Sequence, residues 1–265
     1  MLADLESRFH CMYETVLFAG KRLMDFFGKK ELFVRHKDKE NPVSEADLTV
    51  NAIILDSIAH YFPQDSYVSE ETEETSRPTK NKEYRWVIDP LDGTKPFLRG
   101  RDEFSISVGL LYHDIPALGF IYNPAKEFYL CGGYGMGIYF FHERLDLTQA
   151  PTKKPDEIRI VVSRTELKEN LFEDLSSFSL TGISSVAYKI ALVVKGNFDL
   201  FISRRPKNEW DIAAGAALLR ERGFFLYDSF FEPISFHNDH PQKTGIICGD
   251  PQYLDILKSI WHQNF

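Results

Sequence analysis

The chain has 265 residues, of which 43% are hydrophobic, and its formal net charge is −8 at pH 7. A chain of this length can bury a substantial core, as one large domain or as two smaller ones packed together. The acidic balance disfavours a protein that coats nucleic acid, because neutralising phosphates needs a basic surface. It does not exclude a small anionic substrate, since a few positive groups and a bound ion can reverse the potential in one cleft.

The N-terminal segment and the cysteines indicate an ordinary cytoplasmic protein. Apolar positions in the first thirty residues are interrupted by charges such as Lys21 and Asp25, which predicts an amphipathic helix and neither a signal peptide nor a membrane span. Cys11, Cys131 and Cys248 are scattered and odd in number, which argues against a disulfide framework and a zinc cluster. We therefore expect a cytoplasmic location, reduced cysteines and no membrane partner.

The first half of the chain predicts helices packed on an antiparallel sheet. Apolar residues at helical spacing predict a helix over residues 1–28, and a capping box at residues 44–47 begins a second helix that continues to Pro63. From Phe104 to Tyr112 the pattern alternates, which predicts a strand with one buried face. Turns rich in Asn, Pro and Gly separate further expected strands at 117–122, 127–131 and 137–141.

A polar segment over residues 148–157 lacks apolar periodicity, so we expect a domain boundary there, with an N-terminal half of 1–147 and a C-terminal half of 148–265. The second half alternates between strands and helices, as in an α/β unit. The expected strands are 158–163, 198–203 and 246–248, and the expected helices are 166–176, 187–195, 210–222 and one at the C-terminus.

The most informative stretch is Asp89-Pro90-Leu91-Asp92-Gly93-Thr94, which follows an apolar run at 86–88. Two acids three positions apart on a straight strand point to opposite faces, but a turn opened by Pro90 and closed by Gly93 can direct both towards one ion. Hard oxygen ligands of this kind suit Mg²⁺. If the amides of Gly93 and Thr94 begin a helix, they are aimed at an anion such as phosphate. The structural alternative is a plain turn.

Three other acids have both a functional and a structural interpretation. Glu70 follows a strand-like pair of residues and could complete a multi-metal site, or it could belong to a solvated acidic loop. Asp211 precedes a run of small residues that would let its helix pack closely and carry the acid inward, or it could only cap that helix. Asp47, the third residue after Ser44 in the capping box, could hold the hydroxyl of Thr94.

Together these segments resemble the inositol monophosphatase family of magnesium-dependent, lithium-sensitive phosphatases. Four motifs occur in the right order and span nearly the whole chain. They are Lys37–Asp47 (Lys-x-Lys-x-Asn-Pro-Val-Ser-x-Ala-Asp), Ser69-Glu70-Glu71, Trp86–Lys95 (Trp-Val-Ile-Asp-Pro-Leu-Asp-Gly-Thr-Lys) and Glu209–Ala214 (Glu-Trp-Asp-Ile-Ala-Ala).

The resemblance implies an α+β fold, a layered αβαβα sandwich of the inositol monophosphatase/fructose-bisphosphatase type, with an active-site cleft between its two halves. It implies that Glu70 and Thr94 orient the attacking water, with Asp47 supporting Thr94. The implied ligands of Mg²⁺ are Glu70, Asp89, the carbonyl of Leu91, Asp92 and Asp211. The expected substrate contacts are Asp92, Gly93, Thr94, Lys189, Arg205 and Asp211.

Details of the motifs look more like the bacterial 3'(2'),5'-bisphosphate nucleotidase branch, including Ser163-Arg164, while Pro96, Lys39 and residues 185–187 depart from its pattern. The basic segment 204–207 could hold a second phosphate, or it could be an exposed loop. We therefore expect a small phosphorylated substrate, adenosine 3',5'-bisphosphate, that loses its 3'-phosphate. The alternatives are an inositol-1-phosphate or sugar-phosphate phosphatase and a non-catalytic regulator, and a homodimer is left open.

Overall fold

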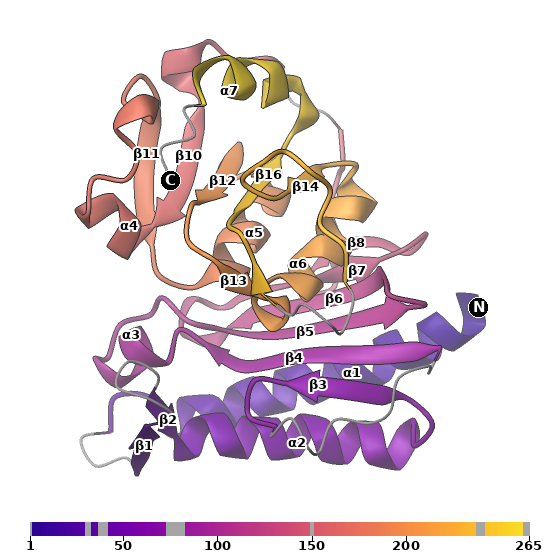
Figure 1. Cartoon of the computed structure of the whole chain (residues 1–265). Coiled ribbons are helices and arrows are strands. Elements are labelled where there is room, and N and C mark those ends of the chain that lie inside the picture. Colours follow the sequence, from indigo (N-terminus) through magenta and orange to yellow (C-terminus); the bar gives the residue numbers. More distant parts are fainter. Residues whose placement is uncertain are drawn as a thin grey trace.

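The computed structural model describes residues 2–29, 33–36, 42–72, 83–148, 151–236 and 242–261, which form five alternating layers of helix and sheet (Figure 1). A helical pair covers the outer face of a seven-stranded sheet, a second pair lies between the two sheets, and short helices flank the five-stranded sheet. The α+β, αβαβα prediction is thereby confirmed. The helices are α1 (Leu2–Met24), α2 (Glu45–Tyr61), α3 (Thr94–Leu98), α4 (Arg164–Lys168), α5 (Val186–Lys195), α6 (Glu209–Arg222) and α7 (Leu254–Ile260).

The seven-stranded sheet has its strands in sequence order, from β3 to β9. Only β3 and β4 are parallel, and every other neighbouring pair is antiparallel, so the predicted meander is confirmed. Its strands are β3 (Ser66–Ser69), β4 (Tyr84–Asp92), β5 (Ser105–Tyr112), β6 (Ile115–Asn123), β7 (Phe128–Gly133), β8 (Gly137–Phe140) and β9 (Glu143–Arg144).

The five-stranded sheet has the order β11-β10-β12-β16-β14 and mixes parallel and antiparallel pairs. The sequence did not predict its two edge strands, β11 and β14. Edge strands bury little on one side, and β11 has no fully buried residue, so its hydrophobic pattern is weak. The strands are β10 (Arg159–Ser163), β11 (Ser179–Ile183), β12 (Leu200–Ser203), β14 (Phe225–Tyr227) and β16 (Ile246–Gly249).

The predicted helix over 166–176 was wrong. Helix α4 ends at Lys168, because Asn170 adopts a left-handed conformation with φ 57°, and a separate 3-10 turn follows at Glu173–Leu175. Other 3-10 turns lie at Pro124–Lys126, Pro155–Glu157 and Pro251–Tyr253. Two small antiparallel pairs join β1 (Val34–His36) to β2 (Pro42–Ser44) and β13 (Lys207–Asn208) to β15 (Gln242–Lys243).

Some predicted features lie outside the described residues. They include residues 37–41 of the first motif, the acidic residues after position 72, and positions 149 and 150 of the expected boundary segment. In the part of the chain that is described, none of the helices has the length and apolar character that a membrane crossing requires.

Helix α6 packs very closely against the seven-stranded sheet. A Cβ atom added at Gly119 of β6 would lie 2.1 Å from the carbonyl oxygen of Ala214, and one added at Gly109 of β5 would lie 2.8 Å from the carbonyl carbon of Ala213. No larger residue fits at these two positions without moving the helix. The prediction that small residues let this helix approach a neighbouring element is therefore confirmed.

A buried ion pair connects the same helix to β4. The guanidinium of Arg85 donates from Nη1 to Oε2 of Glu209 at 3.0 Å and from Nη2 to Oε1 at 3.1 Å. Nη2 also donates to Asp114 and to the carbonyl oxygen of Phe236. Both side chains of the pair are buried, so each depends on the other to offset its desolvation. The pair fixes the start of α6 relative to the strand that carries Asp89.

Replacing Arg85 with methionine is expected to reduce the free energy of unfolding by about 3 kcal/mol or more, because it leaves the carboxylate of Glu209 buried without its cation. Chemical denaturation measures the loss. The control is Arg22→Gln, since the ion pair of Arg22 with Asp25 is half exposed on both sides and should contribute less than about 1 kcal/mol. Equal small losses in both variants would contradict this role for Arg85.

Candidate active site

A β-bulge, and not the predicted turn, places Asp89 and Asp92 on one face. Strand β4 continues to Asp92, and its pairing with β5 shifts register, so that Asp89 lies opposite Ser107 while Asp92 lies opposite Ser105. Residues 90 and 91 therefore face a single residue of β5. One extra residue inverts the alternation of side chains, so two acids three positions apart point the same way. Proline is tolerated at a bulge because that position makes no ladder hydrogen bond.

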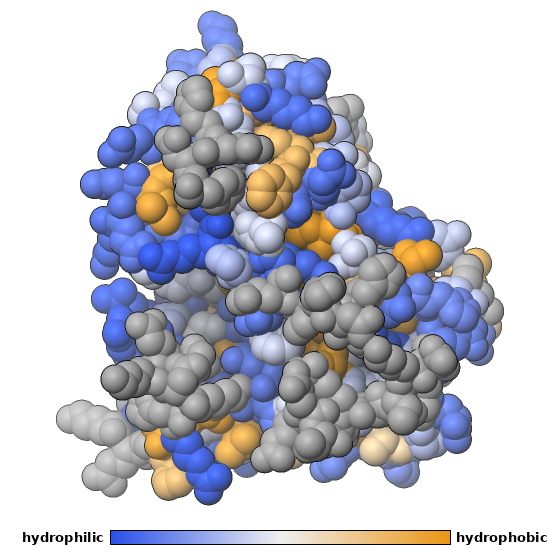
Figure 2. Space-filling view, in the orientation of Figure 1, coloured by the Kyte–Doolittle hydropathy of each residue, from blue (hydrophilic) through white to orange (hydrophobic). Residues whose placement is uncertain are grey.

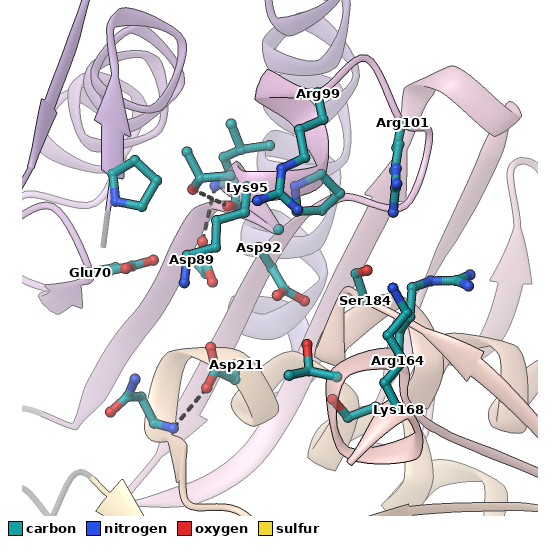
Figure 3. Close-up of a pocket in the computed structure, with 18 residues that line it drawn as sticks. Glu70, Asp89, Asp92, Lys95, Arg99, Arg101, Arg164, Lys168, Ser184 and Asp211 are labelled. Carbon is teal, nitrogen blue, oxygen red and sulfur yellow. Dashed lines mark hydrogen bonds between the residues drawn. The ribbon is translucent and has the colours of Figure 1, made fainter. Parts of the chain in front are cut away.

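Asp211, at the start of α6, meets the two aspartates of β4. Asp89, Asp92 and Asp211 each offer a carboxylate oxygen, and these atoms all lie within 4.8 Å of one another. Figure 3 shows the three carboxyl groups around a shared space, with the carboxyl group of Glu70 directed towards Asp89. The structure thus brings together four acids from β4, from the end of β3 and from α6.

Burial and the charges of neighbouring carboxylates raise the pKa values of Asp89 and Asp211. Burial raises the pKa of Asp89 well above its ordinary value, and the neighbouring carboxylates raise it further. Burial and the charge of Asp92 raise the pKa of Asp211 to about 8. Clustered carboxylate oxygens that repel one another in a buried place are the donor set that a hard divalent cation neutralises. The residues therefore fit a divalent metal site.

Asp92 is held in place by the start of helix α5 from the other half of the chain. Its Oδ2 accepts a hydrogen bond from Ser185 Oγ at 2.6 Å and another from the backbone N–H of Ala187 at 2.6 Å. Ser185 is the N-cap of α5 and also contacts Ser105 Oγ at 3.0 Å. The helix dipole favours a carboxylate at this end. This contact was not predicted from the sequence, although a serine preceding an apolar run is an N-cap signal.

Thr94 and Asp47 form the hydroxyl–carboxylate pair that the sequence predicted. Thr94 Oγ1 lies 2.9 Å from Oδ1 of Asp47 and 3.2 Å from the carbonyl oxygen of Leu91, so its single proton is donated to one of them. Asp47 Oδ2 accepts from the backbone N–H and the hydroxyl of Ser44. Burial raises the pKa of Asp47, and the hydrogen bonds from Ser44 oppose that rise. The lone pairs of Thr94 Oγ1 are thereby left to accept from a water molecule.

The carboxylate cluster and Thr94 line a cavity of about 530 Å³, whose wall is formed by residues between positions 42 and 101 and between positions 163 and 211. Asp47 is buried behind Thr94 and is not part of that lining. In the space-filling view, hydrophilic side chains lie above and below an indentation at the left edge, between the positions of α4 and α3 (Figure 2). Among the predicted site residues, those that line the cavity are Glu70, Asp89, Leu91, Asp92, Gly93, Thr94 and Asp211.

The structure does not bring Lys189 and Arg205 to the cavity, although both were expected to contact substrate. Lys189 is fully buried and donates to the carbonyl oxygens of Ile183 and Ser184, and burial lowers its pKa to about 8. Arg205 forms an ion pair with Glu169, and 52% of its side chain is exposed. Lys189 therefore supports the backbone that precedes α5, and Arg205 belongs to the outer surface.

Five cationic residues line the cavity instead, and the sequence analysis did not assign any of them to a substrate. They are Lys95, Arg99, Arg101, Arg164 and Lys168. The available signal was the density of basic residues between positions 95 and 101, directly after the metal-binding stretch. Figure 3 shows Arg99, Arg101, Arg164 and Lys168 on the side of the cavity away from Glu70.

Comparison with known proteins identifies the family. The model of the inositol monophosphatase family matches residues 4–262, so the chain belongs to this family. It is 32% identical to the 3'(2'),5'-bisphosphate nucleotidase CysQ of Haemophilus influenzae, over 86% of this chain and 88% of that protein. It is 31% identical to the fructose-1,6-bisphosphatase/inositol-1-monophosphatase of Aquifex aeolicus, over 93% of this chain and 92% of that protein.

Solved structures of the same fold agree. The extragenic suppressor protein SuhB of Bartonella henselae superposes with a TM-score of 0.84 at 25% identity, over 98% of this chain and all of that chain. The IMPase of Thermotoga maritima superposes with a TM-score of 0.82 at 24% identity, over 96% of each chain, and shows the fold alone. Family and relatives together indicate a phosphatase of the inositol monophosphatase/CysQ type.

Without metal, the protein is expected to lose stability as the pH rises from about 5 to about 8. A carboxyl group whose folded pKa is raised stabilises the fold fully below its ordinary pKa of 3.8, and this contribution is lost as the pH rises through the folded value of about 8 for Asp211. Thermal unfolding in a chelator measures the effect. Asp211→Asn should flatten the pH dependence, and so should a saturating divalent cation. An identical slope in wild type and variant would contradict the account.

Proposed function

We propose that this protein is a magnesium-dependent phosphomonoesterase that removes the 3'-phosphate of adenosine 3',5'-bisphosphate. The observation that carries the proposal is the convergence of Asp89, Asp92 and Asp211 on one cavity whose lining also includes Thr94, the hydrogen-bond partner of Asp47. The similarity to the CysQ nucleotidase supports the choice of substrate. Convergent carboxylates of this kind have no structural purpose in a protein that only binds a partner, because their repulsion costs stability.

Mg²⁺ would be held by the carboxylates of Glu70, Asp89, Asp92 and Asp211 and by the carbonyl oxygen of Leu91. The bound metal would supply Lewis-acid stabilisation of phosphoryl oxygens and make a nearby water easier to ionise.

The protein's own groups would position the reactants. Thr94 Oγ1, with its proton donated to Asp47, would accept a hydrogen bond from the attacking water, and Glu70 would also orient that water. The backbone amides of Gly93 and Thr94 would donate to the phosphate, and Asp92 and Asp211 would lie beside the leaving group. Asp47 acts through Thr94 and is a positioning residue. No side-chain nucleophile is needed when water attacks in line.

The nearest competing function is an inositol-1-phosphate or sugar-phosphate phosphatase, and the similarity to the Aquifex aeolicus enzyme favours it as the second candidate. The test is phosphate release with Mg²⁺ from adenosine 3',5'-bisphosphate, inositol 1-phosphate and fructose 1,6-bisphosphate. We expect the highest kcat/KM for the nucleotide. A clear preference for the inositol ester would overturn the proposed substrate, and no turnover of any ester would favour a regulator.

Asp92→Asn is expected to reduce kcat at least about 100-fold with Mg²⁺ while leaving the fold intact, because it removes an anionic ligand without changing volume. The amide oxygen of Asn can still accept from Ser185 and Ala187, so helix α5 keeps its cap. Steady-state kinetics and the unfolding midpoint measure the two effects. Asp56→Asn, an exposed acid on α2, is the matched control. If Asp92→Asn retained its turnover, Asp92 would not be a ligand of a catalytic metal, and the proposed active site would be wrong.

We also propose, as extensions of the family resemblance, inhibition by lithium, a cytoplasmic location and assembly as a homodimer. Lithium inhibition is checked in the same phosphate-release assay, and the molar mass in solution reports on the dimer.

A further inference from the structure

We infer that Arg99, Arg101 and Lys168, here called the cationic wall, bind a second phosphate group of the substrate. This inference rests on the proposed function and names the residues of this chain that would distinguish a bisphosphate from a monophosphate. The wall lines the same cavity as Asp89, Asp92 and Asp211.

The cationic wall has no counterion in the part of the chain that the structure describes. Arg99 and Arg101 follow helix α3, Lys168 ends α4, and none of the three side chains forms an ion pair or hydrogen bond with a described residue. Arg164 differs, because Glu103 accepts from both Nε and Nη2 of its guanidinium and neutralises it. Three uncompensated positive charges therefore face one cavity of a chain whose formal net charge is −8.

Glu103 also fixes the wall across the two halves of the molecule. Its Oε2 accepts from the backbone N–H of Ser184 at 3.1 Å and from Ser184 Oγ at 2.9 Å, while the same carboxylate pairs with Arg164. Arg164 and Lys168 are four positions apart on α4 and so lie on one helix face. These contacts hold α4 beside the segment that follows α3, so that cations from both halves face the same space.

The distribution of charge within the cavity favours a substrate with two phosphate groups. Carboxylates lie at one end together with Lys95, where a divalent cation and the reacting phosphate would sit, and Arg101, Arg164 and Lys168 lie at the other end (Figure 3). A substrate with a single phosphate would leave the cationic wall repelling itself, whereas a second dianion would neutralise it. Arginine binds phosphate through two parallel N–H donors, which gives the interaction direction as well as strength. The wall would thus take the role that was one of two interpretations of segment 204–207, the other being an exposed loop.

The test compares adenosine 3',5'-bisphosphate with adenosine 3'-monophosphate in the full chain with Mg²⁺. For each of Arg99→Gln, Arg101→Gln and Lys168→Gln, we expect the ratio of kcat/KM for the bisphosphate to that for the monophosphate to fall about tenfold, which corresponds to one charge-assisted contact. The change should appear in KM. Lys21→Gln, an exposed lysine of α1 outside the cavity, is the matched control. An unchanged ratio in the triple variant would overturn the proposal.

The experiment also distinguishes an error in the proposed substrate from an error in the proposed role of the cationic wall. If the protein hydrolyses hexose esters and not nucleotides, the same variants are compared on fructose 1,6-bisphosphate and fructose 1-phosphate, and the ratio should still fall. If no ester is hydrolysed, calorimetric titration with adenosine 3',5'-bisphosphate should show weaker binding in the triple variant, and equal binding would overturn the proposal. Equal losses for both members of a pair would mean that the wall attracts any anion, and would likewise overturn it.

Discussion

The close approach of helix α6 to the seven-stranded sheet is the constraint on which the site depends. Gly109 and Gly119 on the sheet and Ala213 and Ala214 on the helix leave no space for a larger side chain between them. At that separation the first turn of α6 reaches the bulge of β4, and Asp211 meets the aspartates there. Arg85 and Glu209 then fix where the helix begins. Packing of small residues and one buried ion pair thus determine the geometry of a charged cluster.

The two helix starts that carry functional acids use one structural device. Asp47 and Asp211 are each the third residue of a helix, and in both cases Oδ2 accepts from the N-cap backbone. The other oxygen of Asp47 holds Thr94, and Asp211 contributes to the carboxylate cluster. Capping and function are therefore compatible roles of one carboxylate, and the cap orients the side chain that the site uses.

Much of the site could be predicted from residue types because its chemistry is local in sequence. Sequence patterns indicated the acids of the bulge, the Thr94–Asp47 pair and the small residues of α6. The structure places each of these where the patterns predicted. The bulge itself could not be predicted, since its register shift depends on pairing with Ser105 and Ser107 of another strand. The predicted substrate contacts of Lys189 and Arg205 were wrong for a related reason. The partner of a long basic side chain depends on tertiary contacts, which the spacing of residues along the sequence does not reveal.

The central claim is that Asp89, Asp92 and Asp211 share a divalent cation, and anomalous diffraction from crystals soaked in Mn²⁺ tests it most directly. Mn²⁺ takes the same oxygen ligands as Mg²⁺ and can be located by its anomalous signal. The account predicts an anomalous peak enclosed by these three carboxylates. Absence of any peak there at saturating Mn²⁺, in crystals whose three side chains are well defined, would contradict it.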